Sequence, residues 1–210
     1  RVLDGAVVLF DGKMGVEPQS ETVWHQADGF GVPRVCFINK INQTGGDFWK
    51  SLKSIRARLS HHATPIQIPI GFEKDIRGIV DLVKMKAYTY KNYSDKELKE
   101  EEIPDDLKKE AETWRAELIE KAVLSDDALT EKYLAGEKLE EAELVYAIRK
   151  STLEKKMFPV LGGDGRGVIV ETLLDAVVNF LPAPADLPPV KGKNPKTDKE
   201  EIRKPLDEEP

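Results

Sequence analysis

Two short segments of the chain carry residue types that could hold a flat heterocyclic base. Residues 35–47, VCFINKINQTGGD, begin as an apolar run typical of a strand and continue into a polar loop at Asn39 and Lys40. The Asn39 amide can bond a purine edge, and the Lys40 methylenes can lie along a ring face with the ammonium group left in water. Asn42 lies two residues further on in the same polar loop.

The second segment, residues 161–167 (LGGDGRG), also follows an apolar run and precedes a helical pattern. It places Gly162, Gly163 and Asp164 just beyond a strand. A glycine-rich turn is more often simple geometry than a phosphate site, and an Asn-Lys pair alone is a weak signal. Because both segments follow strands of one predicted parallel sheet, we expect them to share a pocket at the carboxyl ends of those strands.

Other catalytic and metal-binding constellations are missing from the sequence. The histidines have no partners at zinc-ligand spacing, and neither a nucleophile elbow nor a GxxxxGK[ST] phosphate loop occurs. The carboxylates between residues 97 and 143 are typical of solvated helix faces, and Cys36 is interpreted as a small core residue. Three tryptophans are interpreted as packing residues: Trp24, Trp49 and Trp114. We therefore expect no catalytic residue and no metal ligand in this chain.

The composition is that of a globular protein with one strongly acidic segment. The chain has 210 residues, 40% of them apolar, which suffices for one sizeable domain or two small ones. No apolar run approaches the roughly 18 to 20 residues that span a bilayer, and no signal-peptide pattern opens the chain, so we expect cytoplasm or an organelle matrix and no membrane. Residues 91–143 hold eighteen acidic and nine basic residues, which argues against a generic nucleic-acid binder.

Strand and helix patterns alternate in the first sixty residues. Residues 4–11 and 35–38 read as buried strands, and between them a helix starting at Pro18 places Val23, Trp24 and Ala27 on one face. A second amphipathic helix spans residues 48–59. This strand-helix-strand order predicts a parallel sheet with right-handed crossovers.

The middle of the chain changes character and predicts an α+β insert. Residues 66–70, 78–83 and 86–90 predict an antiparallel meander, and residues 91–103 predict a loop. Three helices follow, over about residues 107–122, from a cap at Ser125 or Asp126 to 136, and over 140–153. A strand at 157–161 and a helix at 168–181 then resume the parallel sheet, before a proline-rich extended exit.

Six segments, in this order and spacing, resemble the translation elongation factor G family of bacteria and organelles. They are RVLDGAVVLFDGKMGVEPQSETVWHQAD, GVPRVCFINKINQTGGDF, PIQIPIG, GIVDLVKMKA, EKYLAGEKLEEAEL and LLDAVVNFLPAPADLPPVKG. The resemblance implies a truncated P-loop-GTPase-like α/β sheet with helices on both faces. Residues 1–64 and 155–190 would form the C-terminal part of the GTP-binding domain, residues 65–154 its insert, and residues 191–210 a linker toward a second domain.

The same resemblance implies a function and partners. The family protein is a GTPase that promotes ribosomal translocation, so GTP or GDP, ribosomal RNA and the ribosomal stalk protein, the last through the insert, are the expected partners of a monomer. The guanine base would meet Asn39, Lys40, Asn42, Gly162, Gly163 and Asp164. The phosphate loop, the switch segments, the Mg²⁺ ligands and the catalytic histidine lie upstream in the family. We therefore expect these 210 residues alone not to turn over GTP.

Two departures from the family pattern fall in the base pocket. Asn42 replaces the carboxylate that accepts from guanine N1–H and the 2-amino group, a loss of about 1.5 to 3 kcal/mol, and its amide would suit a 2-oxo base such as xanthine. Gly162, Gly163 and Asp164 replace Gly-Ser-Ala. We expect Asn42→Asp to tighten GDP binding in the full-length parent, because aspartate restores the paired acceptor. Two alternatives stay open: a degenerate ribosome-binding paralogue, and a ribosomal-protection or release-type GTPase.

Overall fold

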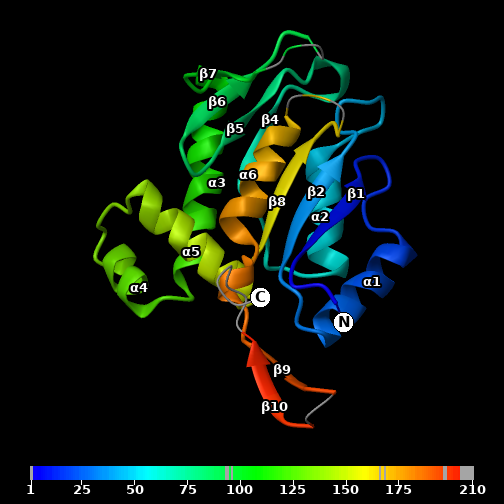
Figure 1. The fold of residues 1–210 in the computed structure, drawn as a ribbon. Coiled ribbons are helices and arrows are strands. Elements are labelled where there is room, and N and C mark those ends of the chain that lie inside the picture. The colour runs from blue at the N-terminus through cyan, green and yellow to red at the C-terminus, as the bar shows by residue number, and fades with distance from the viewer. Residues whose placement is uncertain are drawn as a thin grey trace.

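A computed structural model describes residues 2–92, 95, 97–165, 167, 169–195 and 198–203. Its body is a four-stranded, wholly parallel sheet in the order β1-β2-β8-β3 (Figure 1). The strands are β1 (Ala6–Asp11), β2 (Arg34–Asn39), β3 (Ala63–Pro65) and β8 (Phe158–Gly163). The predicted α/β architecture with an interrupted parallel sheet is confirmed.

Helices cover both faces of this sheet because successive residues of a strand point to opposite sides. On β2, Val35 and Phe37 pack in the same cluster as Phe180 of α6 (Val170–Phe180). The intervening Cys36 and Ile38 pack with side chains of α1 (Pro18–Gly29) and α2 (Phe48–Arg58). The continuous apolar run of β2 is thus explained by burial on both faces.

The edge of the sheet at β1 is left open. Among the described strands β2 alone pairs with β1, and Leu9 in the middle of β1 is 59% exposed. On α1, the prediction that Val23 shares the inward face with Trp24 was wrong. Trp24 is buried, whereas Val23 is 52% exposed. The Arg34 guanidinium fills the space near Trp24 instead, 4.2 Å from its ring centroid, and donates to the Trp24 carbonyl at 2.9 Å.

The insert contains an antiparallel sheet and three helices. The strands pair in the order β4-β5-β6-β7, with β4 (Gln67–Ile70), β5 (Gly78–Asp81), β6 (Lys86–Thr89) and β7 (Lys99–Glu101). The helices are α3 (Asp105–Val123), α4 (Asp127–Leu134) and α5 (Glu141–Leu153). Asp126 caps α4 by accepting from the Leu129 N–H at 3.1 Å, as one of the two predicted caps.

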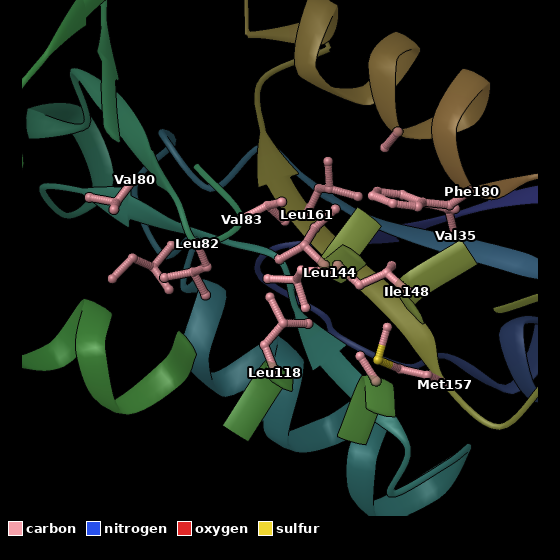
Figure 2. Packing of buried hydrophobic residues seen from close by; sticks show 14 of the residues in the cluster. Val35, Val80, Leu82, Val83, Leu118, Leu144, Ile148, Met157, Leu161 and Phe180 are labelled. Atoms are coloured by element: carbon pink, nitrogen blue, oxygen red, sulfur yellow. The ribbon is translucent and has the colours of Figure 1, made fainter. Parts of the chain in front are cut away.

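The insert and the body share buried side chains. Figure 2 shows Val35 and Leu161 of the parallel sheet in one cluster with Leu82, Leu118 and Leu144 of the insert. The boundaries proposed for the two parts stay a prediction, but their cores are continuous.

A pair of tryptophans adds a second contact between body and insert. Trp49 of α2 stacks on Trp114 of α3 with ring centroids 4.9 Å apart and planes 16° apart. Arg56 of α2 lies over the Trp114 ring and pairs with Glu117. The interpretation of Trp49 and Trp114 as packing residues is consistent with this arrangement.

Three features of the fold were not predicted. β3 is only three residues long and runs almost directly into β4, so the chain passes from the parallel to the antiparallel sheet within two residues. β7 lies in the segment predicted to be a loop. The expected extended exit contains a hairpin of β9 (Val190–Lys193) and β10 (Glu200–Arg203), seen at the bottom of Figure 1.

Candidate functional site

The polar residues predicted to form a site lie at one edge of the parallel sheet. The register pairs Asp11 with Asn39 and Asn39 with Gly163, so β1, β2 and β8 end side by side. Loops that follow parallel strands converge at this carboxyl edge, where ligands of open α/β sheets bind. Asn39 therefore stands between the two segments singled out from the sequence.

The Asn39 side chain joins these two loops. Its Oδ1 accepts from the Lys40 N–H at 2.8 Å and from the Gly165 N–H at 2.9 Å. The second bond spans 126 positions in the sequence. With Oδ1 engaged by the protein, the amide nitrogen is the part of Asn39 suited to a ligand acceptor.

Lys40 has a strained backbone and a fixed ammonium group. Its φ of 61° lies in the left-handed region, which costs a non-glycine residue about 1 to 3 kcal/mol. Its Nζ donates to Asp11 Oδ2 at 2.8 Å, and this bond is the main reason that the pKa of Asp11 is lowered from its ordinary value. The Lys40 side chain, whose ammonium group was expected to be left in water, is half-exposed and also pairs with Asp11.

A cavity of about 290 Å³ opens at this edge. Its lining consists of Leu9, Phe10, Asp11, Glu17, Asn39 and Lys40. A larger cavity of about 370 Å³ lies between the insert sheet and α5 and α6, and neither Asn39 nor Lys40 lines it. Of the six residues chosen from the sequence, Asn39 and Lys40 line the smaller cavity.

Asn42 and Asp164 lie next to each other but do not line that cavity. Asn42 Nδ2 donates to Asp164 Oδ2 at 3.0 Å. Asn42 Oδ1 is buried and has no hydrogen-bond partner among the described residues. A buried acceptor without a donor costs about 1 to 3 kcal/mol, so a ligand N–H at this position would offset a real penalty.

Gly162 and Gly163 are buried in the end of β8. A Cβ at Gly162 would lie 2.5 Å from the Phe48 ring, and a Cβ at Gly163 would lie 2.3 Å from Ile169 Cγ2. These glycines let α2 and the start of α6 approach the sheet closely. Their predicted contact with a base stays a prediction.

Three residues that support the site were missed. Asp11 holds Lys40, the buried Gln67 amide donates to the Gly162 carbonyl at 2.9 Å, and Glu73 accepts from the Gly45 N–H at 2.7 Å. Asp11 ends a predicted strand of the same sheet, and this signal could have identified it. Gln67 and Glu73 come from the insert, and no local pattern points to them.

The geometry agrees with the comparison with known protein families. The model of the elongation factor Tu GTP-binding domain matches residues 1–183. The chain belongs to this family of translational GTPase domains. Guanine-nucleotide binding is the family's property, and the Asn39-Lys40 edge is where this chain could meet the base.

A solved protein from Thermus thermophilus has a similar structure. It shares 29% sequence identity with this chain and superposes with a TM-score of 0.78 over 89% of the chain. The chain spans 28% of the length of that protein. The similarity therefore extends over most of this chain.

On the loops after β2 and β8, two side chains carry acceptors of the kind to which a base N–H group donates. The orphaned Asn42 Oδ1 and the Asp164 carboxylate are acceptors suited to base N–H groups. No group of three or more His, Cys, Asp or Glu side chains that could hold a metal is found within the described part of the chain. No helix in that part is long and apolar enough to cross a membrane.

Proposed function

We propose that this chain is the base-reading part, with the insert, of a GTPase of the elongation factor G type, which promotes ribosomal translocation. The observation that carries the proposal is the edge at Asn39, whose side chain binds the loops after β2 and β8 together in a chain of the elongation factor Tu GTP-binding family. The inserted sheet and helices between β3 and β8 support a factor whose GTP-binding domain is enlarged in this way.

Within this proposal each residue of the edge has a task. The Asn39 amide nitrogen donates to the purine, and the Lys40 methylenes cover one face of its ring, with the ammonium group held by Asp11. The bound nucleotide would supply the phosphates and a Mg²⁺ ion, for which the described residues offer no ligand group. GTP, the ribosome with its RNA, and a cytoplasmic or organellar location are parts of the same proposal.

The test uses the full-length gene product. Ribosomes should stimulate its GTP hydrolysis, and the protein should move messenger RNA by three nucleotides in a toeprinting assay. Hydrolysis without movement would favour the ribosomal-protection or release type. Ribosome binding without stimulated hydrolysis would favour the degenerate paralogue.

We further propose that the insert meets the stalk protein through the outer face of α3. Four acidic side chains are exposed there, Asp105, Asp106, Glu112 and Glu120, beside the exposed Lys108 and Lys109. The proposed contact joins this acidic surface to a basic segment of the stalk protein, and such an attraction weakens as salt screens it.

Charge variants test this contact. Glu112→Lys with Glu120→Lys should weaken binding to the stalk protein and reduce its salt dependence, whereas Lys109→Glu should strengthen binding. All three sites are exposed, so the fold should tolerate the changes. Binding that is insensitive to both salt and charge would refute the contact.

A further inference from the structure

The two sequence departures in the base pocket are in contact with each other. Asn42 and Asp164 are 122 positions apart, yet their side chains share a hydrogen bond of 3.0 Å. The loop after β8 thus carries a carboxylate next to position 42, whereas the family pattern has the carboxylate on the loop after β2. The carboxylate gained at position 164 offsets the one that is missing at position 42.

We propose that Asp164 supplies the carboxylate that position 42 lacks, and that Asn42 positions it, so that the pair reads a purine with N–H donors on its edge. The inference rests on the proposed guanine-nucleotide function and names its specificity residues. A carboxylate has about four acceptor sites, so Asp164 can accept from Asn42 and still accept from a base. Guanine, with N1–H beside its 2-amino group, offers two such donors.

Asn42 contributes a second acceptor as well as positioning. Its Nδ2 donates to Asp164, which fixes the amide orientation and leaves Oδ1 buried without a donor among the described residues. A ring N–H placed at Oδ1 and an amino group placed at Asp164 would satisfy both acceptors. Xanthine carries oxygens at positions 2 and 6, and one of them would face the carboxylate, so this geometry disfavours the 2-oxo base that Asn42 alone suggested.

Because of this contact, introducing the family's aspartate at position 42 is expected to weaken base binding instead of strengthening it. Asn42→Asp would place a second carboxylate next to Asp164, at the present distance of 3.0 Å between Nδ2 and Oδ2. Two carboxylates this close repel, and one of them is forced to take a proton. An aspartate at position 42 would therefore be useful only when residue 164 is uncharged, as in the family's Gly-Ser-Ala.

The family serine at position 163 is incompatible with this chain for a separate reason. A Cβ there would lie 2.3 Å from Ile169 Cγ2. The variant that restores the family's residues at both positions without this clash is therefore Asn42→Asp combined with Asp164→Ala, with Gly163 retained.

The experiment measures GDP, IDP, XDP and ADP binding by calorimetry with the nucleotide-free full-length gene product. The parent should bind GDP about ten-fold or more tighter than IDP, which lacks the 2-amino group, because one hydrogen bond to a charged group is lost. Asp164→Asn, which keeps the side-chain shape, should weaken GDP by about ten-fold to one-hundred-fold and abolish the preference over IDP.

The remaining variants test whether positions 42 and 164 act as a coupled pair or whether each substitution simply removes a contact with the base. Asn42→Asp alone should weaken GDP binding, and Asn42→Asp with Asp164→Ala should restore it. Asp175→Asn on α6 is a matched control at an exposed site away from the pocket, and it should bind like the parent. Thermal unfolding of each variant checks that it is folded.

Three outcomes would overturn the assignment. They are GDP binding by Asp164→Asn equal to that of the parent, tighter GDP binding by Asn42→Asp alone, and a preference of the parent for XDP or ADP. In the first two cases the parent still binds GDP, and the proposed function survives. A folded parent that binds no guanine nucleotide would refute the proposed function and the pair together.

Discussion

Gly163→Ser should destabilise the protein although serine stands at this position in the family pattern. The φ of Gly163 is outside the left-handed region, so a side chain meets no backbone penalty there. The added Cβ, however, would lie 2.3 Å from Ile169 Cγ2, where about 3.4 to 4 Å is ordinary contact. The cost is therefore steric.

The magnitude follows from two opposing effects. Overpacking a buried site costs about 1 to 3 kcal/mol, and replacing glycine stabilises by about 0.4 to 1 kcal/mol through the unfolded chain. A net loss of about 1 to 2 kcal/mol should lower Tm by about 2 to 8 °C in a chain of this size. Ile169→Ala removes the obstructing methyl group, so the serine should cost little in that background.

Urea unfolding followed by tryptophan fluorescence measures all four members of this double-mutant cycle. Gly192→Ser is the control, because nothing lies within 4 Å of a Cβ at that strand position. A Gly163→Ser variant as stable as the parent, or a serine cost that is the same with and without Ile169→Ala, would refute the steric argument.

Three further predictions concern Cys36, Asp81 and Trp114. Burial raises the pKa of Cys36 to about 12, so the thiol should resist maleimide at pH 8 until urea unfolds the chain, and labelling of the native protein would contradict this. Burial also raises the pKa of Asp81, so its stabilising effect is full in acid and is lost as pH rises through the folded-state pKa. Asp81→Asn keeps an acceptor for the turn and should raise Tm at pH 7 but not in acid, and equal gains at both pH values would count against this account. Trp114→Ala removes the stack on Trp49 and should cost up to about 3 kcal/mol in one cooperative urea transition, whereas separate transitions for body and insert would argue against their coupling.

Periodicity in the sequence was sufficient to predict most of the architecture. The apolar run around Val35 and the spacing of Phe48, Leu52 and Ile55 depend on local burial, and the structure buries all four side chains. The edge rule for parallel sheets likewise placed Asn39 beside the loop after β8. Patterns of this kind report which face of an element is covered.

Features that depend on distant partners escaped prediction. β7 has the sequence Lys-Glu-Glu and is a strand only because β6 pairs with it, and such charges suit an edge strand that must not recruit another. The contact of Asn42 with Asp164 joins residues 122 positions apart. In the sequence, each of these two departures looks like the separate loss of a base contact. Only the three-dimensional structure shows that the two side chains contact each other.

The open edge of β1 has a consequence for how the protein behaves at high concentration. Its outer backbone groups and the exposed Leu9 form a template onto which another extended segment can add, without charges or a proline in residues 6–10 to prevent it. We expect these 210 residues to associate edge to edge unless some other strand covers β1, against the prediction of a monomer. The solubility of the protein would then depend on the unprotected edge of β1, however well the hydrophobic core is packed.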